Sequence, residues 1–193
     1  MSRWQPDARE RLERAAIELF TEKGFAATTV PEITARAGLT TRTFFRHFAD
    51  KREVLFGGEA ISGLADRFLA DVPADADPVT LIITGLTTAA ETRFEGRRAE
   101  LRQRWAIVRS DDSLRERELR KWDAVREATR HALLSRGATA TTAALLADTS
   151  VSVFQVSLEQ WLDQDGERPL AELITGTFQS LRTALTTSGP ERG

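Results

Sequence analysis

The sequence contains no cysteine and no tyrosine, and its two histidines, His47 and His131, lie far apart in the chain. Without cysteine there is no disulfide, no thiol chemistry and no Cys-ligated metal site. The sequence also has no pair of histidines at metal-ligand spacing and no glycine-rich phosphate loop after a strand. Catalysis needs a positioned acid, base, nucleophile or metal. We therefore expect neither an enzyme nor a protein with a metal or cofactor.

Long apolar runs are also missing. No stretch approaches the twenty or so apolar residues that a membrane-spanning helix needs. The opening residues Met-Ser-Arg-Trp-Gln-Pro-Asp lack the apolar core of a secretory signal. A hydrophobic fraction of 41% nevertheless supports a core. These features predict a cytoplasmic protein with no membrane partner.

The net charge of −2 is distributed unevenly. Residues 1–56 hold 10 Lys and Arg against 8 Asp and Glu, so this part is positive and the remainder is negative. Within residues 39–52 four basic side chains stand against Asp50 alone. A run of charge is often only a solvated surface. Here the basic residues lie on a short segment flanked by turns, which favours binding to phosphate.

Residues 28–56 predict two short helices separated by a tight turn at residues 37–39. Thr29 and Glu32 have the spacing of a capping box, and Pro31 is tolerated in a first helical turn. Gly38 stands where the end of a helix needs a left-handed residue. Thr40 or Thr41 can cap the second helix. A short helix, a turn with Gly and a second short helix are typical of a domain that places one helix in the DNA major groove.

In the second short helix Phe44 and Phe48 are four residues apart, so both are expected to face inward. The outer side then carries Arg42, Thr43, Phe45, Arg46 and His47. Asp50 is predicted to cap a long fourth helix from Lys51 to about Asp71, with Glu53 completing a second capping box. Lys51 is expected to be free to reach phosphate. Within this helix Gly57, Gly58 and Gly63 allow either close helix packing or a compliant connector.

The remainder of the chain is also predicted to be helical. Arg9–Lys23 is amphipathic, and residues 72–78, rich in Pro and Asp, are the clearest break. Five helices follow, at about 78–95, 97–109, 112–136, 138–163 and 169–187. The predicted fold is all-α: an N-terminal three-helix helix-turn-helix domain is joined by the long fourth helix to a C-terminal helical bundle that dimerises. The predicted domains are residues 1–52 and 53–187, followed by a disordered tail at 188–193.

The first fifty-odd residues resemble the TetR family of bacterial transcription regulators. The resemblance rests on Leu-Phe-x-x-x-Gly-Phe at the end of the first helix and on Thr-Thr-Val-x-x-Ile-x-x-x-Ala-Gly-Leu-Thr-x-x-Thr-Phe-Phe-Arg-His-Phe-x-Asp-Lys-x-x-Val-Leu after it. It implies a homodimer that binds a palindromic operator in double-stranded DNA, in most members as a repressor. It also implies release when a small-molecule effector enters the C-terminal domain. For DNA binding the resemblance implies Thr40, Thr41, Arg42, Thr43, Phe45, His47 and Lys51. With Arg46 on the outer side of the same helix and Thr29 at the start of the first short one, these are the candidate DNA-binding residues.

Two positions of the second short helix depart from the family pattern. Phe45 stands where the family most often has Tyr, so a hydroxyl that usually donates to phosphate is absent. Arg42 stands where many members have a small residue. It could bind guanine O6 and N7, which is typically worth about 1–3 kcal/mol of discrimination, or act as a second phosphate clamp.

Aromatic residues at helical spacing are typical of a helix core, but members of the family form a ligand pocket among these helices. The candidate pocket residues are Phe94, Trp105, Trp122 and Phe154. An apolar or acyl-CoA-like effector is suggested by the similarity of Leu-Thr-Thr-Arg-Thr-Phe-Phe-Arg-His-Phe to one branch of the family. The alternative is a DNA-binding regulator without small-molecule control.

The last two predicted helices have wide apolar faces, and a terminal helix of this kind requires a partner. Two such helices from each subunit would form a four-helix interface with two-fold symmetry. Symmetry of this kind predicts an inverted-repeat operator. The candidate interface residues are Val151, Leu158, Phe178, Leu181 and Leu185.

Overall fold

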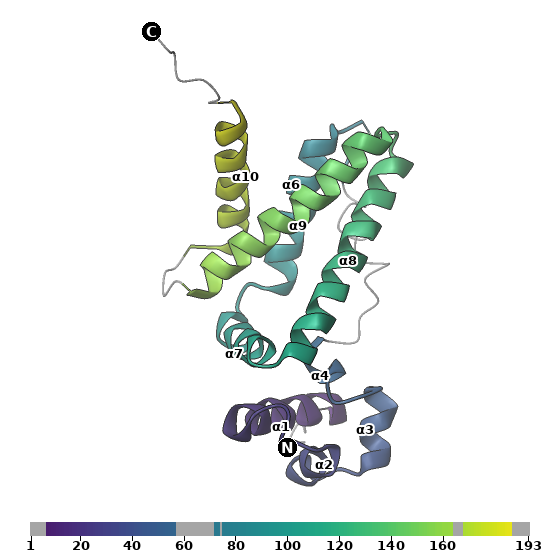
Figure 1. Ribbon diagram of the computed structural model, residues 1–193, viewed down its shortest axis with the longest axis vertical. Helices are drawn as coiled ribbons and strands as arrows, with labels where there is room; N and C mark the ends of the chain where they lie inside the picture. Colours follow the sequence, from purple (N-terminus) through teal and green to yellow (C-terminus); the bar gives the residue numbers. More distant parts are fainter. Residues whose placement is uncertain (1–6, 57–71, 74, 164–167, 187–193) are drawn as a thin grey trace, which may run out of the picture. The chain divides into compact units, whose positions relative to one another are not determined.

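A computed structural model of the chain describes residues 7–56, 72–73, 75–163 and 168–186. Over these ranges the chain forms helices and no strand, as predicted (Figure 1). The described helices are α1 (Ala8–Lys23), α2 (Val30–Ala37), α3 (Thr41–His47), α4 (Glu53–Phe56), α6 (Pro78–Arg93), α7 (Arg98–Arg109), α8 (Asp112–Ser135), α9 (Ala140–Asp163) and α10 (Leu170–Thr186). None of them is long and apolar enough to cross a bilayer.

The chain divides into two compact units. One comprises Met1–Glu59 and Ala99–Arg120, and the other comprises Ala60–Arg98 and Lys121–Gly193. The first unit therefore includes most of α7 and the beginning of α8 together with α1–α4. The sequence predicts a domain boundary after residue 52, and no local pattern marks residues 99–120 as part of the first unit.

The first unit has one apolar core to which every one of its helices contributes. Leu12, Ile33, Phe44 and Val54 are each fully buried in it. Ile107, Val108 and Leu114 from α7 and α8 belong to the same core. Burying a large apolar side chain stabilises a fold by about 1.5–3 kcal/mol. The side chains of α7 and α8 are thus part of what holds this unit together.

The fourth helix is described only over Glu53–Phe56. Its start matches the expected cap, because Glu53 N–H donates to Asp50 Oδ1 at 3.0 Å. The Glu53 carboxylate accepts from Ala49 N–H at 2.7 Å, one residue before the position expected for a capping box. The predicted continuation to residue 71, with Gly57, Gly58 and Gly63, lies outside the described residues, as does the tail 188–193.

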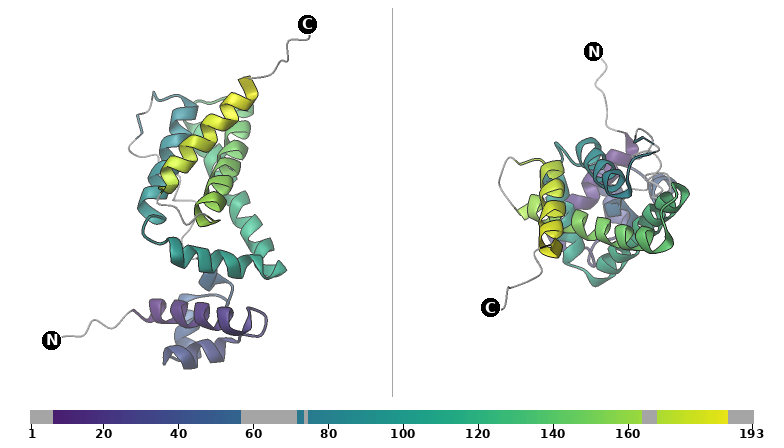
Figure 2. Two further views of the ribbon diagram at one scale, coloured as in Figure 1. Left: turned by 90° about the vertical axis from the view of Figure 1, so that its left-hand side faces the viewer. Right: turned by 90° about the horizontal axis from the view of Figure 1, so that it is seen from above.

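The first described helix of the second unit, α6, begins where the sequence predicted. Asp77 Oδ1 accepts from the N–H groups of Val79 and Thr80, each at 3.0 Å, so α6 starts at Pro78. Helix α10 packs against both α6 and α9, as the views of Figures 1 and 2 agree. Across both units, the first and last residues of the five helices α6 to α10 lie within two residues of the predicted bounds.

Candidate nucleic-acid interface

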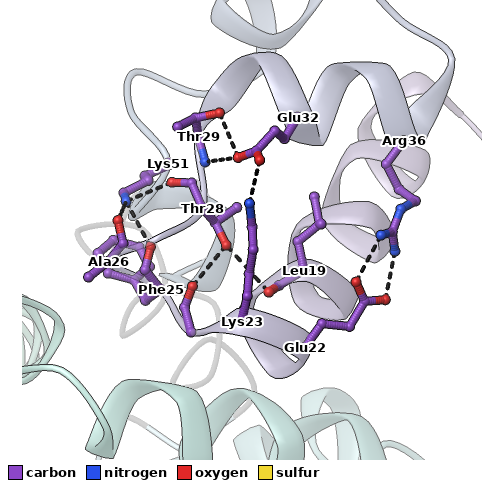
Figure 3. A network of polar contacts seen from close by, with 11 residues as sticks. Leu19, Glu22, Lys23, Phe25, Ala26, Thr28, Thr29, Glu32, Arg36 and Lys51 are labelled. Carbon is purple, nitrogen blue, oxygen red and sulfur yellow. Dashed lines mark hydrogen bonds and ion pairs between the residues drawn. The ribbon is translucent and has the colours of Figure 1, made fainter.

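The beginning of α2 is organised by Glu32. Its Oε2 accepts from Thr29 N–H at 2.8 Å and from the Thr29 hydroxyl at 2.7 Å, while Oε1 pairs with Lys23 (Figure 3). The Lys23 ammonium and the Thr29 donors lower the pKa of Glu32 to about 2. Glu32 thus makes its half of the predicted capping box, whereas the Thr29 hydroxyl donates to the Glu32 carboxylate and makes no cap hydrogen bond to the helix backbone.

The turn between α2 and α3 forms as the sequence predicts. Gly38 has φ of 63°, in the left-handed region where glycine is favoured over residues with a Cβ atom. Its N–H donates to Ala35 O at 3.1 Å, and Leu39 N–H donates to Thr34 O at 2.9 Å. Arg11 Nη2 of α1 adds a hydrogen bond of 2.6 Å to Ala37 O. The end of α2 is therefore tied to α1 as well as closed by its own backbone.

Helix α3 begins at a side-chain cap, because Thr40 Oγ1 accepts from Thr43 N–H at 3.2 Å. Phe44 and Phe48 are buried, with ring centroids 5.3 Å apart, as their spacing predicted. They fix which side of α3 faces the core. Residues on the other arc are exposed or partly exposed: Thr40, Thr41, Arg42, Thr43, Phe45, Arg46 and His47. One short helix thus presents two guanidinium groups and several hydroxyls to solvent.

Phe45 is the unusual member of this surface. Its side chain is 55% exposed, although its ring edge packs at 84° against Phe44 with centroids 5.4 Å apart. Water solvates an exposed phenyl ring poorly, but a thymine methyl or a sugar can pack against it. The ring can do the packing part of the usual Tyr but cannot donate a hydrogen bond.

Lys51 differs from the freely reaching side chain that the sequence suggested. Its Nζ donates to Phe25 O at 2.8 Å and to Thr28 O at 2.9 Å, and lies 3.4 Å from Ala26 O (Figure 3). Nζ also lies 4.2 Å from the centre of the Phe25 ring. Burial lowers the pKa of Lys51, and the Asp111 carboxylate opposes that shift. The ammonium therefore holds the α1–α2 loop in place.

Asp50 joins the start of α4 to α8. Its Oδ2 lies 3.2 Å from Arg52 Nη2 and 3.5 Å from Arg117 Nη1. Burial by itself would raise the pKa of Asp50, but the Glu53 N–H and the Arg117 and Arg52 charges outweigh it, so that the pKa is lowered. The segment that follows α3 is thus anchored by a carboxylate that stays ionised.

Known regulatory proteins have sequences similar to this helix-turn-helix segment. Residues 13–56 match the model of bacterial regulatory proteins of the tetR family. The regulator TcmR of Streptomyces glaucescens is 42% identical over 74 residues, which is 37% of this chain and 32% of TcmR. This chain thus spans about a third of the length of that relative. The similarity to the tetR family is thus established over residues 13–56, the helix-turn-helix segment of this chain.

Solved structures of TetR-family regulators share the fold over nearly the whole chain. The repressor FadR of Thermus thermophilus is similar with a TM-score of 0.53 and 23% identity, covering 96% of this chain and 97% of FadR. NalD of Pseudomonas aeruginosa has a TM-score of 0.62 and 20% identity, covering 89% and 94%. At these identities the likeness concerns the fold.

Of the four candidate pocket residues, three come together in the second unit. The Phe94 ring meets Phe154 with centroids 5.3 Å apart, and Trp122 meets Phe154 at 5.7 Å. Trp105 belongs to the first unit, where the Arg109 guanidinium carbon lies 4.3 Å from its ring centre. The spacing along the sequence grouped all four, because it does not distinguish helices of different units.

The candidate interface residues differ in how much surface they offer. Leu185 is 72% exposed, while Leu158 and Leu181 are partly exposed. Phe178 is partly buried against the core of the second unit. Val151 is only 3% exposed within the single chain, so a partner would reach it only after repacking.

The residues that the sequence reasoning missed are those that join the helices of the first unit. They are Arg11, Glu13, Arg104 and Arg117. Each looks like one more surface charge in a helical pattern, and its partner lies far away in the sequence. No local motif could have identified them.

Proposed function

We propose that this protein is a DNA-binding transcriptional regulator that acts as a repressor on a palindromic operator. The observation that carries the proposal is the construction of α3. Its N-terminus is capped by Thr40, its inner side is anchored by Phe44 and Phe48, and its outer side carries Arg42 and Arg46. A rigidly held short helix with basic residues on its outer arc matches the geometry of a recognition helix in the major groove.

We assign different roles to the residues on the outer arc. Arg46 and His47 are proposed to bind phosphate, and Thr41 and Thr43 to contact the backbone or base edges near the helix start. Arg42 is the candidate for direct base recognition, because a guanidinium can bind guanine O6 and N7 together. Phe45 is proposed to pack on a sugar or a thymine methyl. The contacts of Lys51 support a different role for it, in holding the loop that leads to Thr29 and α2.

The regulator is proposed to act as a homodimer through α9 and α10. The exposed side chains Val156 and Leu185 lie on these two helices, at 45% and 72% exposure. Two copies related by a two-fold axis would place two α3 helices on successive half-sites, so the operator should be an inverted repeat.

Control by a small-molecule effector is the second part of the proposal. The aromatic cluster Phe94, Trp122 and Phe154 lies among the helices of the second unit and could contact an apolar effector. The similar FadR of Thermus thermophilus was solved in complex with lauroyl-CoA. An apolar or acyl-CoA-like effector is therefore the first class to test, and regulation without a small molecule is the alternative.

The decisive experiment selects bound sequences from random duplex DNA with the purified full chain. We expect an inverted repeat. Arg46→Gln should weaken binding to selected and random duplexes alike and reduce the slope of log K against log salt by about 1. Arg42→Gln should relax base choice at one position of each half-site. Arg120→Gln, at a side chain 73% exposed on α8, is the matched control and should change neither.

Failure to enrich any sequence, with binding absent at 50 mM salt, would refute the DNA-binding proposal. A uniform loss of affinity in Arg42→Gln would instead make Arg42 a phosphate contact. Adding lauroyl-CoA to the complex with the selected duplex tests effector control directly. Release of the DNA at micromolar lauroyl-CoA would support it, and no release by a series of acyl-CoA chain lengths would exclude this class of effector.

A further inference from the structure

Three helices of the first unit are joined by a chain of charged contacts that centres on Arg104 of α7. Arg104 Nη2 lies 2.9 Å from Glu13 Oε2 of α1, and Arg104 Nε lies 2.9 Å from Glu100 Oε1. Arg104 Nη1 donates to Val54 O of α4, also at 2.9 Å. One planar guanidinium therefore holds α1 and α4 at the same time.

Burial separates this arrangement from the ordinary ion pairs on the surface. The Arg104 side chain is 12% exposed and that of Glu13 is 20% exposed. By contrast, Arg120 and Glu116 pair on α8 at 73% and 64% exposure. Exposed pairs of the second kind contribute little because water screens them and ordering the side chains costs entropy. Removal of one partner from a shielded pair leaves the other charge poorly solvated.

The contacts continue from Glu13 to the end of the recognition helix. Arg9 Nε lies 2.9 Å from Glu13 Oε1, and the Arg9 guanidinium carbon lies 5.0 Å from the centre of the Phe48 ring. Phe48 is the C-cap residue of α3, and its N–H donates to Phe44 O at 2.9 Å. A continuous path of contacts thus runs from α7 through α1 to the end of α3.

Apolar packing supports the same path independently. Ile107 and Val108 follow Arg104 on α7 and are buried in the core that also contains Phe44 and Phe48. Helix α7, which carries Arg104, therefore contributes to the core of the first unit. Arg104 does not lie on the outer arc of α3, and its guanidinium contacts groups of the protein itself.

We infer that Arg104 is a positioning residue for DNA binding. It binds α1 and α4 from α7 and thereby sets the orientation of α3, without contacting DNA. The inference rests on the proposed function. It assigns to DNA binding a residue about fifty positions beyond the helix-turn-helix segment. A Lys at this position could pair with Glu13, but it lacks the fork needed to hold Val54 O as well.

The test compares full-length Arg104→Gln, Arg104→Lys and Glu13→Gln with Arg120→Gln as control, using the duplex selected by the unmodified protein. Anisotropy titrations are run between 50 and 200 mM salt, at a temperature where circular dichroism shows every variant folded. We expect Arg104→Gln to lose affinity by on the order of tenfold, about 1.4 kcal/mol. The salt slope should be unchanged, because no phosphate contact is removed. Arg104→Lys should be intermediate.

The Glu13→Gln and Arg104→Gln double variant adds a second readout. If the two residues act together, the double variant should bind little worse than Arg104→Gln alone. Should Arg104→Gln fail to fold, Glu13→Gln carries the test, since it leaves the hydrogen bond of Arg104 to Val54 O and its ion pair with Glu100 in place. Its affinity should then fall at constant salt slope.

The outcomes are distinguishable. Folded variants that bind with unchanged affinity would overturn the inference and leave the proposed function intact. A salt slope reduced by about 1 would make Arg104 a phosphate contact and also overturn it. Absence of any duplex binding by the unmodified protein would refute the proposed function and the positioning role with it.

Discussion

Replacement of Lys51 by Met removes an ammonium from a site built by backbone carbonyls. The side chain of Met is similar in length and apolar, so packing against Phe25 is retained. The carbonyls of Phe25 and Thr28 lose donors at 2.8 and 2.9 Å. Hydrogen bonds to charged groups contribute about 1.5–3 kcal/mol, and an exposed cation–π contact about 0.5–1 kcal/mol. Water can hydrogen-bond to the freed carbonyls and so replace part of this stabilisation. We therefore expect the free energy of unfolding to fall by about 2 kcal/mol.

The assay is thermal and urea unfolding of the full chain, each followed by circular dichroism, together with a salt titration of DNA binding. For a chain of this size, 2 kcal/mol corresponds to a fall in Tm of about 4–8 °C. The salt slope should not change, because the Lys51 ammonium is engaged by the α1–α2 loop. Arg46→Met is the matched control with the opposite pattern. Its stability should change by less than about 0.5 kcal/mol, while its slope falls by about 1.

The reasoning about Lys51 is refuted by one combination of results. If Lys51→Met unfolds at the same urea concentration as the unmodified protein but shows a reduced salt slope, then Lys51 binds phosphate and the carbonyl site contributes nothing. Lys51→Arg provides a further check. Its larger planar head does not fit the same three carbonyls, so we expect it to recover only part of the stability.

Two further predictions concern the ends of α2. Gly38→Ala should destabilise the protein by about 1–2 kcal/mol in urea unfolding, because a Cβ is disfavoured at φ of 63° and would lie 3.1 Å from Arg11 Nη2; an unchanged midpoint would contradict this. Glu32 has its pKa lowered from 4.5 to about 2 by Lys23 and Thr29, so the stability it contributes is present above pH 4.5 and is lost as the pH falls toward 2. Acid titration of Glu32→Gln should show a shallower decline over that interval, and a decline as steep as that of the unmodified protein would argue against the assignment.

Local sequence patterns were sufficient to predict the helices and the caps, turn and inward-facing residues of the α2–α3 segment. The cap at Thr40, the left-handed Gly38 and the inward pair Phe44 and Phe48 all follow from rules that involve residues within four positions of one another. The same rules placed the start of α6 at Pro78. Such features depend on short-range geometry, so that a sequence alone specifies them.

Only the tertiary structure decided what the charged residues do. Lys51 lies beside carbonyls 23 to 26 residues earlier in the chain, and Arg104 meets Glu13 across 91 positions. The tertiary structure also assigns Trp105 to the first unit and Phe94, Trp122 and Phe154 to the second. It buries Val151 within its own chain. A charge or an aromatic ring at helical spacing has the same local signature whatever it touches. Its partner is set by how distant helices pack, and that is information that no short window of sequence contains.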